Sequence, residues 1–521
     1  METAALRKLP IGIQSFEKLR SENFLYVDKT AFVYKLAVSG LPYFLSRPRR
    51  FGKSLLLSTL EAYFQGKKEL FKGLAIEKLE KDWIEYPVLH LDLNAEKYDS
   101  KERLEGMLNA QLVNWERLYQ IEPDENSSSI RFMNVIRTAY EQTGRRVVIL
   151  VDEYDKPLLQ TFHDLKLQDD FRSILTAFYT VLKSADSYIQ FIFITGVTKF
   201  AQVGVFSTLN QLNDISLDEQ YAALCGLTRE EIACTFEPEL SILAGREKLS
   251  FDEILGKMTK MYDGYYFSED APEGMFNPFS VLSALAKRRL ANFWFATGTP
   301  TFLVDLLKKT DYDLRDLEGI EVTAASLTDY RADYRNPVPM LYQSGYLTIK
   351  GFNDRYNLYR LGYPNEEVKY GFLNFLIPLY TPVSGADGPF FIGKFNDELW
   401  AGETEAFLIR LKSFFADFPY ALNEKSERHY QVVFYLVFKL LGQYADVEIQ
   451  SCRGRADAVV RTPDYIYVFE FKLDGSAQDA LRQIDEKGYL IPYIADGRKL
   501  IKVGVSFSAE ERNLDQWLIE E

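Results

Sequence analysis

Gly52, Lys53 and Ser54 stand in direct succession and are the first residues of this sequence that could do chemistry. They follow a short apolar run and precede three leucines, as in the second half of a P-loop, GxxxxGK[ST]. In such a loop, backbone N–H groups hold phosphates at a helix N-terminus, the lysine reaches the β- and γ-phosphates, and the hydroxyl holds Mg²⁺. The first half differs, because Arg47 stands where the first glycine belongs and Pro48 has no N–H to offer. We expect a strand, a phosphate-binding loop and the start of a helix over 42–57.

A second group of candidate residues follows an apolar run at 147–151. Five consecutive apolar residues predict a strand that is buried on both faces, as in a parallel sheet covered by helices. The run ends in Asp152-Glu153, the Walker B arrangement, in which the aspartate holds Mg²⁺ and the glutamate orients or deprotonates the attacking water. Another buried strand, 189–194, precedes Thr195, and ligands of open α/β sheets bind beyond the carboxyl ends of the strands. Thr195 is therefore a candidate sensor of the γ-phosphate or, alternatively, a hydrogen-bonded turn residue.

Asp457, Glu470 and Lys472 form a third group near the C-terminus. If a four-residue loop joins the two strands expected at 454–461 and 465–473, Asp457 lies directly opposite Glu470, with their Cβ atoms about 4.5–5.5 Å apart. Side chains alternate between the two faces of a strand, so Lys472 shares the face of Glu470. Two carboxylates can hold a divalent cation such as Mg²⁺, and the lysine can position water or stabilise a phosphorane. A cluster of cross-strand ion pairs is the alternative interpretation.

The elements that must position these residues predict an α/β fold class. We expect an N-terminal P-loop NTPase parallel sheet with helices on both faces, a helical lid and connector, and a C-terminal α/β domain. Expected domain bounds are 1–225, 226–385 and 386–521, with a linker at 385–389. Further elements expected from periodicity and capping are helices at 27–36, 54–64, 101–122, 129–142 and 427–441, and strands at 87–93 and 445–450.

Length, charge and cysteine content exclude several classes of protein. At 521 residues the chain is too long for one core, and about 100–200 residues per domain suggests roughly three domains. The net charge of −14 argues against a surface coated in basic patches for non-specific nucleic-acid binding. Cys225, Cys234 and Cys452 form no CxxC pair and no disulfide framework, which favours a reducing, cytoplasmic setting.

The small number of histidines and the lack of long apolar stretches argue against a zinc site and a membrane span. Only His90, His163 and His429 are present, so we expect no zinc site of the usual ligand types, and any metal would be held by carboxylates. No stretch approaches the roughly 18 apolar residues of a membrane span, and the first residues lack an apolar signal segment. We therefore expect a soluble intracellular protein with no membrane partner.

Three runs carry a resemblance to a known family: PIGIQSFEKLRSENFLYVDKT, FLSRPRRFGKSLLLSTLEAYF and VVILVDEYDKPL. They resemble the bacterial AAA-ATPase-like proteins that carry a C-terminal PD-(D/E)XK nuclease-superfamily domain. The resemblance covers about residues 9–507 and is most specific at RPRRFGKS. It implies that the missing first glycine is the family's normal P-loop variant. Arg49 and Arg50 would supply positive charge that an ordinary loop lacks, and Phe51 and Leu55 complete the segment expected to contact ATP.

The resemblance also implies roles near the C-terminus. Asp457 matches the first acid of the nuclease motif, Glu470 the second acid and Lys472 its lysine. Glu427, on the helix expected before the strands, matches the extra acid that many such nucleases use. Gln483 fits the glutamine that some branches place on the following helix, although its spacing to Tyr489 is looser than in their usual motif. The implied cofactors are ATP and Mg²⁺, with Mn²⁺ as an alternative at the nuclease-like site.

Two classes of function stay open at this point. In the first, a P-loop module controls a metal-dependent nuclease that acts on DNA or, less readily, RNA. In the second, a nucleotide-regulated switch or interaction protein uses an inactive nuclease-like domain to dock a partner, and an oligomer is compatible with both. Residues 424–502 hold equal numbers of basic and acidic side chains, so phosphate binding would require local clustering of basic residues, namely Arg453, Arg455, Arg461, Arg498 and Lys499. Clustering of Arg453, Arg455 and Arg461 beside the acids favours the first class, and acids that are paired off by these three arginines favour the second.

Overall fold

The structure is a computed structural model that describes most of the chain in two compact units. The described residues are 7–122, 126–161, 164–199, 212–295, 303, 306–307, 312, 314–328, 336–381, 388–416, 427–449, 456–508, 510–511 and 513–521. The first unit comprises 1–312 with 317–368, and the second comprises 313–316 with 369–521. The expected three-part division stays a prediction. Of the expected linker, 385–387 lie outside the described residues, and the rest begins a helix.

A five-stranded parallel sheet organises the first unit, as the sequence predicts. Its strands occur in the order β2-β3-β4-β1-β5. Their bounds are β1 (Tyr43–Ser46), β2 (Val88–Asp92), β3 (Val147–Asp152), β4 (Ile189–Gly196) and β5 (Asn213–Asp214). All six residues of β3 are buried, as expected for a central strand covered on both faces. The order places β4 between the strand before the P-loop and the strand that ends in Asp152.

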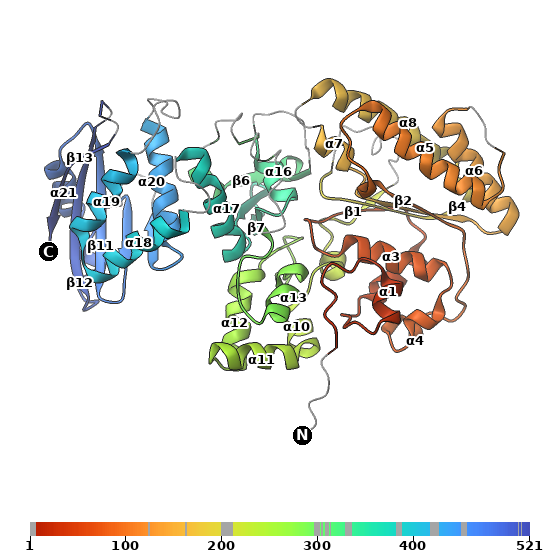
Figure 1. Ribbon diagram of the computed structural model, residues 1–521, viewed down its shortest axis with the longest axis horizontal. Helices are drawn as coiled ribbons and strands as arrows, with labels where there is room; N and C mark the ends of the chain where they lie inside the picture. Colours follow the sequence, from red (N-terminus) through yellow and green to blue (C-terminus); the bar gives the residue numbers. More distant parts are fainter. Residues whose placement is uncertain are drawn as a thin grey trace. The chain divides into compact units, whose positions relative to one another are not determined.

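Helices cover both faces of this sheet (Figure 1). One face carries α1 (Phe16–Ser21), α3 (Lys53–Phe64) and α4 (Ala75–Leu79), and the other carries α5 (Lys101–Leu118), α6 (Ser128–Thr143) and α8 (Leu165–Ser184). The short helices α2 (Thr30–Ser39) and α7 (Lys156–Gln160) complete this part of the unit. Gly66, which has φ 65°, follows α3 and ends it close to the predicted residue. The fold class predicted for this region is therefore confirmed.

The rest of the first unit is a helical group followed by a small antiparallel sheet. The helices are α10 (Arg229–Thr235), α11 (Glu237–Glu247), α12 (Phe251–Tyr262) and α13 (Pro278–Lys287). Capping boxes start α10 and α12. The side chains of Thr228 and Ser250 each accept a backbone N–H from the glutamate three residues on, and that glutamate's carboxylate accepts the backbone N–H of Thr228 or Ser250 in return. The sheet has the order β6-β8-β7, with β6 (Glu321–Thr323), β7 (Thr348–Asn353), β8 (Leu358–Gly362) and the adjoining helices α15 (Ala324–Thr328) and α16 (Val338–Gln343).

The second unit is built on a mixed five-stranded sheet in the order β13-β12-β11-β10-β9. Its strands are β9 (Asp446–Ile449), β10 (Ala458–Arg461), β11 (Tyr465–Leu473), β12 (Lys499–Ser508) and β13 (Asn513–Glu520). Its helices are α18 (Gly388–Ala401), α19 (Thr404–Ala416), α20 (Glu427–Leu441) and α21 (Ala477–Glu486), and α17 (Glu366–Tyr380) enters it from the first unit.

The two faces of β11 have different partners. Phe469 packs against Phe407 of α19 and Phe438 of α20, whereas Ile466 and Val468 share a buried cluster with residues of α21. Alternate residues of β11 therefore point to opposite faces, as the sequence predicts. None of the helices in the described ranges combines the length and the apolar character that a membrane-spanning helix needs.

Candidate active sites

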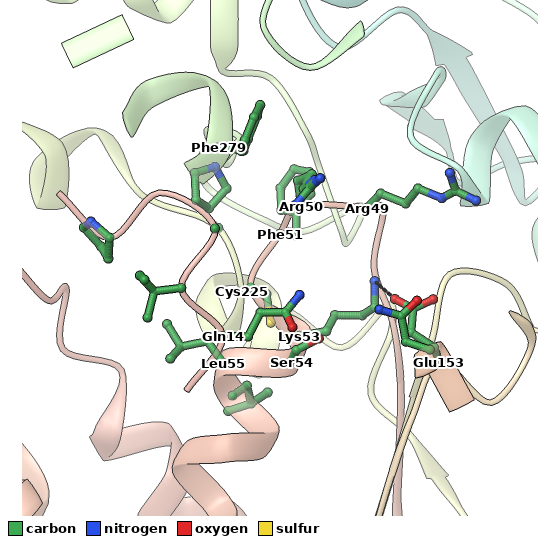
Figure 2. Close-up of a pocket in the computed structure, with 18 of the residues that line it drawn as sticks. Gln14, Arg49, Arg50, Phe51, Lys53, Ser54, Leu55, Glu153, Cys225 and Phe279 are labelled. Carbon is green, nitrogen blue, oxygen red and sulfur yellow. Dashed lines mark ion pairs between the residues drawn. The ribbon is translucent and has the colours of Figure 1, made fainter. Parts of the chain in front are cut away.

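The P-loop turns sharply before α3. Two residues of the turn have left-handed backbone conformations, Arg50 at φ 69° and Gly52 at φ 94°, and α3 starts at Lys53. The loop borders a cavity of about 980 Å³. Figure 2 shows this cavity. Seven of the residues that the sequence assigned to nucleotide contact line it, together with Glu153: Arg49, Arg50, Phe51, Gly52, Lys53, Ser54 and Leu55. The other two, Asp152 and Thr195, are not among the lining residues, and both are buried.

Lys53 is directed toward the loop and the acid at the end of β3. Its ammonium Nζ donates to the carbonyl oxygens of Arg47 (3.0 Å) and Pro48 (3.3 Å). The same nitrogen lies 3.5 Å from a carboxylate oxygen of Glu153, and this ion pair is drawn in Figure 2. Because Lys53 is nearly buried, its charge is held at one place at the mouth of the loop. The sheet order thus brings together a lysine and a glutamate that lie far apart in the sequence.

Asp152 is held by the neighbouring strand. Its Oδ1 accepts hydrogen bonds from the Thr195 hydroxyl (2.7 Å) and from the backbone N–H of Glu153 (3.0 Å). The Thr195 side chain is fully buried and hydrogen-bonded, as in the alternative interpretation, but the residue lies in β4 and not in a turn. Through that contact Thr195 orients the carboxylate, and a role as a sensor of the γ-phosphate stays a prediction. Glu153 itself has φ 52°, a left-handed conformation that is unfavourable for a residue with a Cβ atom.

Asp155 is a supporting residue that the sequence analysis did not single out. Its side chain is fully buried, and its carboxylate accepts hydrogen bonds from the backbone N–H groups of Val197 and Thr198 and from the Thr198 hydroxyl (2.7 Å). Burial, together with the charge of Glu153, raises the pKa of Asp155 to about 6. These contacts tie the turn after β3 to the end of β4. The signal in the sequence was the second aspartate of Asp152-Glu-Tyr-Asp, whose partners are set by the sheet order.

The donor set at the P-loop suits a hard divalent cation. Asp152 Oδ1 takes two hydrogen bonds, and among the described residues Asp152 Oδ2 has no recorded hydrogen-bond partner. A carboxylate oxygen and the Ser54 hydroxyl are the ligand types that Mg²⁺ takes beside nucleotide phosphates. The residues present therefore fit the predicted metal.

The second candidate site lies on β11 and its neighbours. The pairs Ala458–Phe469 and Arg461–Ile466 give β10 and β11 the predicted register, in which Asp457 falls opposite Glu470. The Oδ2 atom of Asp457 accepts a hydrogen bond from the Phe471 backbone N–H (2.8 Å). A one-residue slip would send the acids to different faces, so the register that brings them together is the decisive feature.

Lys472 and Gln483 complete the surroundings of Glu470. Lys472 Nζ lies 3.0 Å from Glu470 Oε1 and 2.5 Å from Gln483 Oε1. The amide nitrogen of Gln483 also donates to Glu470 Oε1, and it lies 3.3 Å from the Tyr489 hydroxyl. Gly504 allows α21 this close, because a Cβ atom there would lie 2.4 Å from the carbonyl oxygen of Ala477. Gln483 therefore bridges the lysine and the acid of the predicted motif.

Glu470 has one carboxylate oxygen that no described group satisfies. Its side chain is 2% exposed, and Oε2 is buried without a hydrogen-bond partner among the described residues. Burial, and then the nearby charge of Asp457, raise the pKa of Glu470 above its ordinary value, and burial also raises that of Asp457. A buried oxygen without a partner is costly unless something binds it. The two carboxylates therefore fit a divalent cation.

The remaining predicted residues are only partly described. Within the described ranges no three His, Cys, Asp or Glu side chains form a metal-binding group. Glu427 is the first residue of α20, but its side chain lies outside the description. Arg453 and Arg455 lie outside the described residues altogether.

The other basic residues proposed for phosphate binding have carboxylate partners elsewhere. Arg461 pairs with Asp446 and Glu448 on β9. Arg498 pairs with Asp496. Within the described ranges Arg461 forms no ion pair with Asp457 or Glu470, and the other two arginines of the criterion are not described, so the criterion favours neither class of function.

Comparison with known proteins finds family matches for the two regions that contain the candidate sites. Residues 10–206 match the family model "Predicted AAA-ATPase", and residues 425–517 match that of the PD-(D/E)XK nuclease superfamily. A protein of Azotobacter chroococcum mcd 1, described as "Uncharacterized protein in vnfD 5'region", is 37% identical over 528 residues, which span 99% of each chain. The chain belongs to the AAA-ATPase-like family with a PD-(D/E)XK nuclease-superfamily domain. The family resemblance stated from the sequence is thereby confirmed.

One solved structure aligns with 69% of this AAA-ATPase-like protein, at low sequence identity. The structure is that of the Aeropyrum pernix ORC2 protein in ADPNP-ADP complexes, with 13% identity, a TM-score of 0.26, and coverage of 69% of this chain and 92% of that one. A likeness of this size supports no conclusion about the site.

The ATPase-like region contains every residue predicted to contact ATP, and the nuclease-like region contains Asp457, Glu470, Lys472 and Glu427.

Proposed function

We propose that the first unit binds ATP with Mg²⁺ and hydrolyses ATP, and that this activity controls a metal-dependent nuclease in the second unit that cleaves DNA. The observation that carries the ATPase proposal is the meeting of Lys53 and Glu153 at the edge of one cavity, 3.5 Å apart, at the carboxyl end of the sheet. Parallel sheets bind their ligands at this edge. The matches of the two regions to ATPase and nuclease families support the pairing of the two activities.

The residues of the first site have separable roles in this proposal. Lys53 contacts the β- and γ-phosphates, Arg49 and Arg50 add positive charge at the loop, and Ser54 and Asp152 would hold the Mg²⁺ ion. When bound, that ion neutralises charge on the phosphates. Glu153 accepts a proton from the attacking water, and Thr195 keeps the Asp152 carboxylate in one orientation.

Turnover of ATP by the purified full-length protein, with and without DNA or RNA, tests this site. Lys53→Ala should raise the ATP dissociation constant at least tenfold, since one charge-assisted contact contributes roughly 1.5–3 kcal/mol. Lys183→Ala is the matched control, because Lys183 is an exposed lysine in the last turn of α8. Equal ATP affinity in the wild-type protein and in Lys53→Ala would refute the assignment.

The nuclease proposal rests on the buried, unpartnered Oε2 of Glu470 beside Asp457. Asp457 and Glu470 would hold Mg²⁺ or Mn²⁺, which when bound activates water and neutralises the phosphate. Lys472 adds a positive charge at the same phosphate, and Gln483 keeps the lysine beside Glu470. Glu427 assists in this proposal as an additional acid.

Cleavage of plasmid and linear DNA, and of RNA, in Mg²⁺ or Mn²⁺ tests the second site. Asp457→Ala and Lys472→Ala should abolish cleavage while leaving the far-UV circular dichroism spectrum unchanged. Asp464→Ala is the control, because Asp464 is exposed at the far turn of the same hairpin. Asp457→Ala should also remove the rise in melting temperature that Mn²⁺ gives the wild-type protein, which reports metal binding without cleavage. Cleavage that survives both substitutions would sink the proposal.

A second candidate function is a nucleotide-regulated interaction protein whose nuclease-like unit cuts nothing. The observation in its favour is that Arg461, Arg498 and Lys499 are each paired with local carboxylates, which lowers the positive charge available for a nucleic-acid backbone. DNA binding or partner binding without cleavage in either metal would favour it. A cytoplasmic location and an oligomeric state stay predictions under both functions.

A further inference from the structure

Arg47 occupies the position at which a standard P-loop has its first glycine, yet its side chain is only 1% exposed. Its Nη1 donates to the carbonyl oxygens of Ser46 (2.9 Å) and Ser216 (2.8 Å), and its Nη2 donates to that of Tyr221 (3.2 Å). The guanidinium carbon also lies 4.0 Å from the centre of the Phe267 ring. The side chain is therefore held by three carbonyl groups and an aromatic face, most of them from segments far along the chain.

The charge of Arg47 has no acidic partner in the described part of the chain. The groups that face it include Cys225, Tyr342 and Asp214, and Asp214 is already paired with Lys199 at 2.6 Å. Burial lowers the pKa of Arg47 to about 10, which leaves it protonated at neutral pH. A buried cation that relies on carbonyl oxygens favours one arrangement of the backbone around it, because any other leaves the charge unsatisfied.

The backbone of the same residue connects the sheet to Lys53. The Arg47 N–H donates to the carbonyl oxygen of Gly196 at the end of β4 (3.2 Å), and the Arg47 carbonyl oxygen accepts from Lys53 Nζ (3.0 Å). The next residue, Pro48, also accepts from Lys53 and is packed so closely that a Cβ atom at Gly345 would lie 2.7 Å from it. Arg47 is not among the residues that line the nucleotide cavity. It supports the loop from the side away from that cavity.

We propose that Arg47 is a positioning residue that replaces the first glycine of the P-loop and holds the loop, and with it Lys53, in the geometry that binds phosphate. This inference rests on the proposed ATP-binding function. In an ordinary P-loop the first glycine lets the backbone turn without a side chain, whereas the left-handed turn residues here are Arg50 and Gly52. A glycine at position 47 would therefore add backbone freedom that the turn does not require and remove the contacts to Ser216, Tyr221 and Phe267. Restoring the usual sequence pattern should weaken nucleotide binding.

The test compares Arg47→Gly, which restores GxxxxGKS, with the wild-type protein and with the control Arg146→Gly. Arg146 is exposed and precedes β3, at the end of the sheet opposite the loop. The first measurement is hydrogen exchange of the backbone amides of 49–56 in full-length protein without nucleotide. The second is the dissociation constant for ATP with Mg²⁺ by titration calorimetry. The third is kcat at saturating ATP.

In Arg47→Gly the backbone amides of 49–56 should exchange at least tenfold faster than in the wild-type protein. The variant should bind ATP at least tenfold more weakly, with kcat at saturating ATP within a few-fold of wild type. Arg47→Lys should also weaken ATP binding, because an ammonium group cannot reach three carbonyl groups and lie flat on Phe267. Arg146→Gly should resemble the wild-type protein in all three measurements.

Wild-type exchange and wild-type ATP affinity in Arg47→Gly would overturn the inference. If Arg47→Gly does not fold, wild-type exchange and wild-type ATP affinity in Arg47→Lys would overturn the inference instead. If the wild-type protein binds no ATP, the proposed function fails, and the exchange measurement alone decides whether Arg47 holds the loop. Unchanged exchange at 49–56 then overturns the inference as well.

Discussion

Glu153 combines an unfavourable backbone conformation with the position of the proposed general base, and this combination can be tested by two substitutions. Its φ of 52° is left-handed. For a residue with a Cβ atom this conformation costs about 1–2 kcal/mol, and glycine avoids the cost but loses roughly 0.5–1 kcal/mol through its greater freedom in the unfolded chain. Glu153→Gly and Glu153→Gln both remove the ion pair with Lys53. The difference between the two variants therefore isolates the strain, and Glu153→Gly should be more stable by about 0.5–1 kcal/mol.

The assay is thermal unfolding and ATP turnover of both variants side by side. A difference of that size corresponds to a melting temperature that is about 1–3 °C higher for Glu153→Gly than for Glu153→Gln. Both variants should lose roughly 10²–10⁴-fold in kcat, the usual contribution of a general base, while ATP binding stays close to wild type. ATP binding is expected to persist because Lys53 keeps its loop contacts with the Arg47 and Pro48 carbonyl groups.

Lys248 provides a matched control for the strain. It has φ 56°, caps the C-terminus of α11 and is exposed, so Lys248→Gly should gain a similar stability over Lys248→Gln with no effect on ATP turnover. Turnover at the wild-type rate in Glu153→Gln would refute the role of Glu153 as a base. A gain at Lys248 without one at Glu153 would show that the left-handed conformation of Glu153 is not strained.

Three further predictions concern the polar groups Asp155, Glu367 and Gln483. Asp155→Asn should lower the free energy of unfolding by about 1–3 kcal/mol in chemical denaturation, because an amide NH₂ would face N–H donors, and an unchanged midpoint would contradict this. Glu367, whose pKa burial raises from 4.5 to about 7, keeps a proton in the folded state between those pH values that the unfolded chain releases. The free energy of unfolding should therefore fall as pH rises through that window, by at most about 3 kcal/mol. Glu367→Gln should remove this pH dependence, and a pH dependence that remains in the variant would show that another group is responsible. Gln483→Ala should reduce metal-dependent cleavage by about 10–100-fold with the fold intact, since Lys472 loses its bridge to the acid, and full activity would contradict the bridge.

The sequence predicts the second site better than the first, for a physical reason. Glu470 and Lys472 share a face because strand side chains alternate, and Asp457 joins them through a hairpin whose register follows from its turn. These are local rules. Lys53 and Glu153 meet only because β4 lies between β3 and β1 in the sheet order, which no spacing in the sequence reveals.

Buried polar residues were the hardest to predict. The sequence shows Arg47 as a departure from the P-loop pattern, but its partners at Ser216, Tyr221 and Phe267 come together only in the folded chain. Asp155 is an acidic turn residue in the sequence, and burial against the end of β4 makes it a structural acceptor. In both cases the role depends on long-range contacts, and residue type alone does not indicate it.

The end of β4 is the common support of the groups proposed for binding and for hydrolysis. The Gly196 carbonyl oxygen accepts from the Arg47 N–H, the Thr195 hydroxyl donates to Asp152, and Thr198 donates to Asp155. Gly196 lies so close to the turn after β3 that a Cβ atom there would be 2.5 Å from an oxygen of Asp155. The P-loop and the acidic turn are therefore aligned through one short stretch of backbone, and neither is positioned by direct contact alone. Because both are hydrogen-bonded to the same strand end, that strand end sets their relative placement and with it the 3.5 Å between Lys53 and Glu153.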